Sequence, residues 1–169
     1  QHFAFEKWSD FDSDLLEELY NDDSNEREFE HKIYGSDISR QAIAIASKNV
    51  ESAGLTKYIH LKAKAVQDIV TTVGNEGLLM TNPPYGERIK PADLMGLYKD
   101  LGERLKHVFA GYQAWVLSYR KECFDNIGLR HSKRVHLMNG ALECEMRLYE
   151  IFSGKMDGYK MRKAHGKEK

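Results

Sequence analysis

Apolar residues recur at the spacing of one helix face in two long stretches of this chain. Between Ser39 and Gly54 they are Ile43, Ala46, Val50 and Ala53. Over residues 94–108 they are Leu94, Leu97, Tyr98, Leu101, Leu105 and Val108. This spacing predicts amphipathic α-helices, the first capped by Ser39 and ended by Gly54. Two shorter helices are predicted over residues 12–20 and near 121–127.

Short apolar runs between these helices predict β-strands over residues 32–37, 58–63, 77–81 and 112–119. Strands that alternate with helices predict a parallel sheet. The end of the chain changes pattern, since residues 133–138 and 143–152 alternate apolar and polar side chains around Asn139-Gly140, a strong hairpin signal. The predicted fold class is therefore α/β, with a mostly parallel sheet and a C-terminal antiparallel hairpin.

Composition fits one globular domain of 169 residues, but its formal net charge of −1 is unevenly distributed. Residues 1–30 carry a net charge of −9, whereas 31–152 and 153–169 each carry +4. A basic middle and tail suit a polyanionic partner such as RNA, although a solvated lysine tail is the commoner explanation. We divide the chain into a folded domain, 1–152, and a basic, disordered tail, 153–169.

Cys123 and Cys144 have no Cys or His at zinc-ligand spacing, so they are predicted to be reduced and near the core. The seven His residues form no His-x-x-x-His pair, and no metal is predicted. Without a signal peptide or an apolar run of about 20 residues, the chain is predicted to be cytoplasmic and free of the membrane. Trp8 and Trp115 are predicted to pack in the interior.

The segment with the clearest chemistry is Asn82-Pro83-Pro84-Tyr85. The apolar run before it predicts a buried strand, and ligands of open α/β sheets bind at the carboxyl ends of strands. The Asn82 side-chain oxygen and the Pro83 carbonyl can each accept one N–H of a base amino group and so direct its lone pair. Tyr85 can stack on a base drawn out of its helix or loop. An ordinary turn that ends a strand is the alternative.

Charged residues near the predicted strand ends supply further candidates. Asp37 ends the strand at 32–37, where a carboxylate can accept both hydroxyls of a nucleoside ribose; a helix cap is the alternative. Arg88 and Lys90 follow the motif and, with Pro84, are predicted to contact the substrate, their charges meeting an RNA phosphate. Exposed basic residues after a turn are an equally good explanation.

Three segments give the chain a resemblance to a known family: Phe3–Trp8, Gly35–Ser39 and Thr81–Arg88. They resemble the class I S-adenosylmethionine-dependent methyltransferases, and more closely the bacterial ribosomal RNA guanine-N2 methyltransferases that carry an RNA-binding THUMP domain. The resemblance implies a Rossmann-like sheet, S-adenosylmethionine as the cofactor with its ribose on Asp37, and ribosomal RNA as the partner. It covers residue 2 to about 160.

Two departures from that family are visible. The first strand of the fold normally ends in a Gly-x-Gly loop, but no two of the thirteen glycines here are two residues apart. The chain is therefore expected to lack the first strand-helix unit, which would lie on a longer parent chain with the THUMP domain. The missing strand should lie between the strands at 32–37 and 77–81, so these two are expected either to recruit another chain or to pair directly. Where the family tends to place an acid near the adenine, this chain has Ala65, which leaves Asp68 as the substitute.

The function predicted from these residues is methylation of a guanine exocyclic amine (N2) in large-subunit ribosomal RNA, by a longer enzyme of which this chain is part. Asn82, Pro83 and Tyr85 are its predicted catalytic residues. Two alternatives stay open. The same motif serves methylation of adenine N6 in DNA or RNA, and a chain without the glycine-rich loop could be an inert domain or a nucleic-acid-binding module. The isolated fragment is expected to be inactive.

Overall fold

The computed structural model describes residues 3–25, 27–87, 89 and 91–152, and the predicted tail 153–169 lies outside them. The described elements follow the predicted order. The helices are η1 (Ala4–Lys7), α1 (Ser13–Asn21), α2 (Arg40–Ser52), η2 (Val66–Asp68), α3 (Leu94–Val108) and α4 (Lys121–Ile127). The strands are β1 (Ile33–Asp37), β2 (Ile59–Ala63), β3 (Gly77–Thr81), β4 (Tyr112–Ser118), β5 (Lys133–Asn139) and β6 (Leu142–Glu150).

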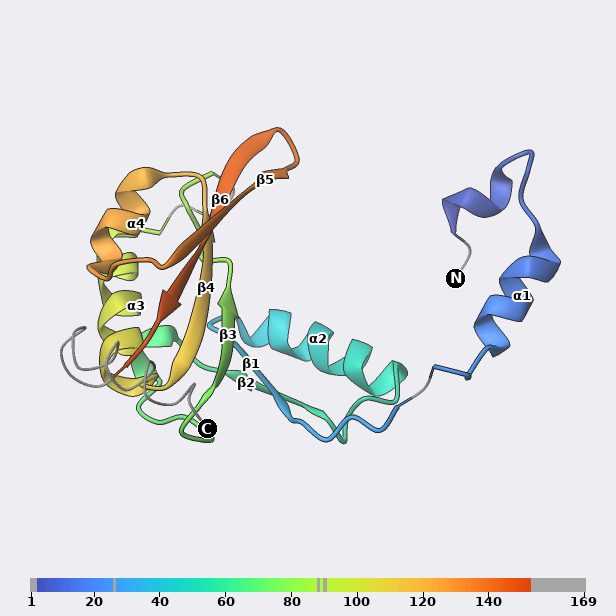
Figure 1. Ribbon diagram of the computed structural model, residues 1–169, viewed down its shortest axis with the longest axis horizontal. Coiled ribbons are helices and arrows are strands. Elements are labelled where there is room, and N and C mark those ends of the chain that lie inside the picture. Colours follow the sequence, from blue (N-terminus) through green and yellow to red (C-terminus); the bar gives the residue numbers. More distant parts are fainter. Residues whose placement is uncertain (1–2, 26, 88, 90, 153–169) are drawn as a thin grey trace, which may run out of the picture.

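The strands form two separate sheets (Figure 1). In the first sheet β1 pairs with β2 in parallel, and α2 lies beside them. The second sheet has the order β3-β4-β6-β5, with β3 parallel to β4 and the last two strands antiparallel. The predicted α/β class with a terminal hairpin is thereby confirmed.

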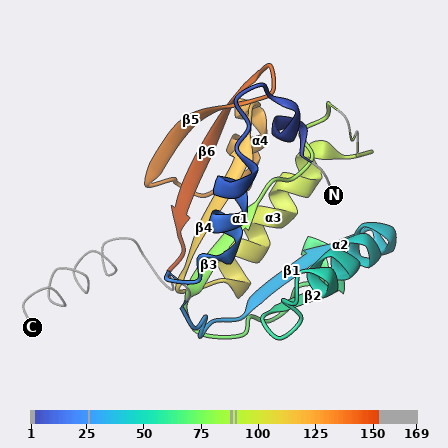
Figure 2. The ribbon, with the colours of Figure 1, turned by 90° about the vertical axis from the view of Figure 1, so that its right-hand side faces the viewer.

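The break between the sheets falls between β1 and β3. This is the position at which the sequence predicts a missing strand. We expected the two strands either to recruit another chain or to pair directly, and direct pairing is wrong, because each hydrogen-bonds on one side only. Figure 2 shows the two sheets from the side, with β1 and β2 diverging from β3 and β4.

The hydrophobic core lies between α3, α4 and one face of the second sheet (Figure 1). Its buried members are Tyr98, Leu101, Leu105, Phe109, Ala114, Val116, Cys123, Phe124, Ile127, Tyr149 and Ile151. Both cysteines are buried and unpaired, as predicted. The expectation that β3 is a buried strand is wrong, since Leu78 and Met80 are 63% and 66% exposed while Leu79 packs against the core. Only one face of β3 is covered.

Helix α1 and the turn before it lie apart from both sheets (Figure 1). The Asp12 side chain caps α1 by accepting the backbone N–H groups of Asp14 and Leu15. Trp8 is 67% exposed, and its prediction as an interior residue is wrong. It contacts Phe5 edge to face, which keeps the aromatic residues of this segment together without covering them.

Gly102 of α3 lies against the backbone at the end of α4. A Cβ at this position would lie 2.0 Å from the Ile127 carbonyl oxygen. We expect Gly102→Ala to lower the free energy of unfolding by roughly 2–3 kcal/mol, because a backbone carbonyl cannot rotate away as a side chain can. Chemical denaturation measures the loss. Lys99→Ala, on the exposed side of the same helix, is the control and should change stability by less than about 0.5 kcal/mol; equal effects would contradict the packing.

Candidate nucleotide and base-binding site

The Asn82–Tyr85 motif follows β3 directly, at the carboxyl end of the strand, where the sequence predicts it. Asn82 is exposed, whereas Pro83, Pro84 and Tyr85 are half-buried. Among the described residues, none forms a side-chain hydrogen bond with Asn82, whereas the neighbouring Tyr85 is bonded to Asn139. Because the prolines fix φ and lack N–H groups, the loop leaves the β-ladder at this point. The Asn82 oxygen is therefore free to accept a donor from a ligand.

The ring of Tyr85 is held by two elements that are distant in the sequence. Its hydroxyl oxygen lies 2.6 Å from the Asn139 Nδ2, which donates to it from the end of β5. Its ring meets the ring of Tyr119 edge to face, with centroids 5.4 Å apart and planes at 82°. Tyr85 also packs against the core cluster. The tyrosine of the motif is thus held at its hydroxyl, by the Tyr119 ring and at its base in the core.

A second contact ties the motif loop to the end of β4. The Tyr119 hydroxyl donates to the Glu87 carboxylate. This hydrogen bond raises the pKa of the Tyr119 hydroxyl above its ordinary value, so the hydroxyl stays a donor at neutral pH. Gly86 has φ of +91°, and a Cβ there would lie 3.2 Å from the Arg120 Nη1, so the loop bends against the Arg120 side chain.

These neighbours were not among the residues chosen from the sequence: Glu87, Tyr119, Arg120 and Asn139. One signal could have found two of them. Tyr119 and Arg120 come directly after β4, which pairs in parallel with β3, and the carboxyl ends of adjacent parallel strands meet at one edge of a sheet. Asn139 carries no such signal, because a hairpin pattern predicts a turn but does not predict which other loop the hairpin contacts. Arg88 and Lys90 lie outside the described residues.

Asp37 is the last residue of β1 and is exposed. Its Oδ1 accepts the backbone N–H of Ser39 at 2.7 Å. The N-cap of α2 is Ser39 itself, whose Oγ accepts the Ala42 N–H at 3.2 Å. The helix cap offered as the alternative role of Asp37 therefore belongs to Ser39, and Asp37 braces the turn that leads into the helix.

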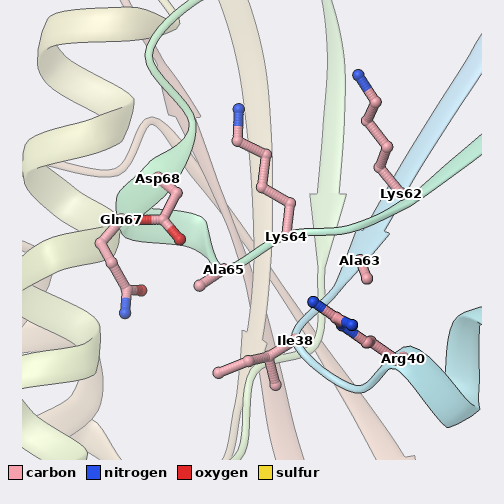
Figure 3. A pocket seen from close by; sticks show the side chains of 8 residues that line it. All are labelled: Ile38, Arg40, Lys62, Ala63, Lys64, Ala65, Gln67 and Asp68. Atoms are coloured by element: carbon pink, nitrogen blue, oxygen red, sulfur yellow. The ribbon is translucent and has the colours of Figure 1, made fainter.

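An open hollow of about 660 Å³ lies at the carboxyl ends of β1 and β2. Its lining is Ile38, Arg40, Lys62, Ala63, Lys64, Ala65, Gln67 and Asp68 (Figure 3). Asp68 is the last residue of η2. The first residue of η2, Val66, and its C-cap, Ile69, pack against the core of the second sheet. The hollow thus brings Asp68 close to Ile38, the residue after Asp37, whereas Asp37 itself is not among the lining residues.

The hollow is rich in positive charge. Figure 3 shows Lys62 and Lys64 projecting the same way from β2 and the segment after it, with Arg40 on the opposite side of the hollow.

Within the described parts of the chain, no three His, Cys, Asp or Glu side chains gather as metal ligands. No helix of those parts is long and apolar enough to cross a membrane.

Known proteins resemble this chain over most of its length. The model of the RMKL-like methyltransferase domain matches residues 2–148. The ribosomal RNA large subunit methyltransferase K/L of Shewanella loihica (strain ATCC BAA-1088 / PV-4) is 35% identical over 157 residues, which are 89% of this chain and 22% of that protein. The chain thus spans about a fifth of the length of this curated relative.

Two solved structures share the fold. SMU.472, crystallised with SAH, is 27% identical, with a TM-score of 0.73 over 92% of this chain and 41% of that one. A predicted N6-adenine-specific DNA methylase from Listeria monocytogenes str. 4b F2365 is 28% identical, with a TM-score of 0.58 over 69% of this chain and 30% of that one. Since the family model covers most of its residues, the chain belongs to the RMKL-like methyltransferase domain family.

Proposed function

We propose that this chain is part of an enzyme that methylates the N2 amino group of a guanine in large-subunit ribosomal RNA, with S-adenosylmethionine as the methyl donor. The observation that carries the proposal is Asn82, which is exposed at the carboxyl end of β3 without a side-chain hydrogen bond to another described residue, beside a tyrosine that Asn139 and Tyr119 hold in place. The curated relative is named as a ribosomal RNA methyltransferase, and SMU.472 holds SAH, the demethylated form of the same cofactor.

Asn82 and Pro83 hold the amine in this proposal. An aromatic amine is a poor nucleophile, because its lone pair is delocalised into the ring. Two acceptors, the Asn82 side-chain oxygen and the Pro83 carbonyl, each bind one N–H and draw the nitrogen toward tetrahedral geometry. Tyr85 stacks on the extruded base and fixes its plane. The chain needs no strong base for these tasks.

The residues at the ends of β1 and β2 fit the nucleoside part of S-adenosylmethionine. Asp37 is exposed and held in place by the Ser39 N–H, so its carboxylate can accept the ribose hydroxyls. The hollow beside it has room for a nucleoside, and Asp68 stands at its rim as an acceptor for an adenine amino group. When bound, S-adenosylmethionine supplies an electrophilic methyl group on a positively charged sulfur.

RNA is the proposed partner. Arg120 places a positive charge against the motif loop, where an RNA backbone would pass. Arg88, Lys90 and Pro84 stay proposed substrate contacts on the strength of the sequence. We further propose that a THUMP domain and the first strand-helix unit lie on a longer parent chain, and that the protein acts in the cytoplasm, where ribosomal RNA is modified in bacteria.

Methylation of adenine N6 is the second candidate, because a structural relative is named as an N6-adenine-specific DNA methylase. One experiment separates the candidates. The parent enzyme is incubated with radiolabelled S-adenosylmethionine and unmodified large-subunit ribosomal RNA, and the nucleosides are analysed after digestion. We expect N2-methylguanosine. N6-methyladenosine would favour the second candidate, and unlabelled RNA despite cofactor binding would favour a binding module without catalytic activity.

Asp37 gives a separate prediction. In the parent enzyme Asp37→Ala should weaken S-adenosylmethionine binding by roughly 1.5–3 kcal/mol, the range for hydrogen bonds to a charged group. Calorimetry measures the affinity and thermal melts measure stability. Ser39→Ala is the matched control, because it removes the cap of α2 and should lower stability by about 1 kcal/mol while sparing the cofactor. If Asp37→Ala behaves like this control, the ribose role is wrong.

A further inference from the structure

The hairpin of β5 and β6 reaches the motif loop across a long stretch of sequence. Its contact is the 2.6 Å hydrogen bond from the Asn139 Nδ2 to the Tyr85 hydroxyl oxygen. Tyr119, at the end of β4, lies against the Tyr85 ring in a T-shaped arrangement and donates to Glu87 of the same loop. Three strands of the second sheet, β3, β4 and β5, therefore converge on one aromatic side chain.

Asn139 is free for this contact because it does not form the turn. It pairs with Leu142 as the last residue of β5, so the two-residue loop is Gly140-Ala141, and Gly140 supplies the positive φ of 63°. The predicted hairpin is confirmed, but its loop lies one residue later than an Asn-Gly turn would place it. Met138, the preceding residue, is 63% exposed on the opposite face of the strand.

We propose that Asn139 is a positioning residue of the base-binding site: it fixes the Tyr85 ring in the orientation that receives an extruded purine. The inference rests on the proposed function of Tyr85 as the stacking residue. The physical reason is preorganisation. A tyrosine held only at its base samples several orientations, and a base that stacks on it must first select one of them. The hydrogen bond at the hydroxyl and the contact with the Tyr119 ring reduce that cost before the base arrives.

The hairpin thus belongs to the base site as well as to the sheet. A neutral side-chain amide is suited to this task, because it donates to the hydroxyl without placing a charge beside the stacked base. An aspartate in its place can reverse the bond, since the tyrosine hydroxyl can donate to a carboxylate. An alanine cannot form the bond in either direction.

Binding of a single-stranded oligoribonucleotide that contains 2-aminopurine to the parent enzyme and its variants tests the proposal. This fluorescent purine has its amino group at the position of guanine N2, and its emission falls when it stacks on an aromatic ring. We expect Asn139→Ala to weaken binding of the oligonucleotide by roughly three- to tenfold, the effect of losing one neutral hydrogen bond. Met138→Ala, which faces away, should bind like the unchanged parent enzyme. Asn139→Asp should keep the fluorescence change of the bound purine, although its charge weakens the binding of RNA.

Two outcomes separate the inference from the proposed function. If Tyr85→Leu abolishes the fluorescence change while Asn139→Ala leaves it intact, Asn139 does not position the ring, but the base site stands. If Tyr85→Leu binds the oligonucleotide as well as the unchanged chain does, Tyr85 is not the stacking residue, and the proposed base site falls with the inference.

A second measurement is independent of any ligand. In the unchanged chain, nuclear magnetic resonance of ¹³C-labelled tyrosine should show slow flipping of the Tyr85 ring, and Asn139→Ala should make it several times faster. In denaturant, the double variant Asn139→Ala with Tyr85→Phe should unfold at the midpoint of the less stable single variant, because both remove the same bond. Additive shifts and an unchanged flipping rate would overturn the proposal.

Discussion

Asn82→Ala is expected to abolish methyl transfer by the parent enzyme while leaving its affinity for S-adenosylmethionine within a few-fold. The side-chain oxygen of Asn82 acts on the amine, and its two tasks, accepting an N–H and aiming the lone pair, matter most in the transition state. Removal of one preorganised hydrogen-bonding group at such a site costs about a hundredfold or more in rate. The loss should therefore appear in kcat.

Steady-state kinetics and a cofactor titration on the purified variant check this expectation. Asn49→Ala is the matched control, because Asn49 is exposed on α2, away from the motif. It should leave both quantities unchanged. Substantial turnover by Asn82→Ala would show that the amine is held by other groups. A parallel loss of cofactor affinity would place Asn82 in the cofactor site instead of the base site.

The secondary structure could be predicted closely from the sequence because its signals are local. Three elements begin and end where the patterns place them: β3 (Gly77–Thr81), α3 (Leu94–Val108) and α4 (Lys121–Ile127). Apolar spacing, capping residues and turn glycines act within a few positions of the chain, so a single sequence contains them. The position of Asn82 could be predicted for the same reason, because the prediction requires only that the strand before it ends at Thr81.

The surroundings of the motif could not be predicted in the same way. Asn139 and Tyr85 are 54 residues apart, and their contact depends on how β5 lies beside β6, β6 beside β4 and β4 beside β3. The prediction that β3 is buried was wrong for a related reason. An apolar run shows that a strand can be covered on both faces, but it does not show that anything covers them.

Self-association of residues 1–169 is the second large effect that we expect. In the part of the chain that the structure describes, strands β1 and β3 each hydrogen-bond to a neighbouring strand on one side, and no described strand pairs with the backbone N–H and C=O groups on the other. Leu78 and Met80 of β3 are 63% and 66% exposed, and Ile33 and Tyr34 of β1 are 47% and 54% exposed. Apolar edges of this kind recruit strands from other chains.

Sedimentation equilibrium of the isolated 169 residues tests this expectation, and the apparent mass should rise with protein concentration. Charges on an edge strand oppose pairing, so Leu78→Lys with Met80→Lys should shift the population toward the monomer. Val70→Lys with Val73→Lys adds the same charge at apolar residues that are 71% and 66% exposed but lie outside the strands. This control should still associate.

Isothermal titration completes the test, because a chain with β1 and β3 unjoined should bind S-adenosylmethionine weakly or not at all. A monomer at every concentration that binds the cofactor with micromolar affinity would contradict both expectations. It would show that the open edges do not cause self-association and do not prevent cofactor binding.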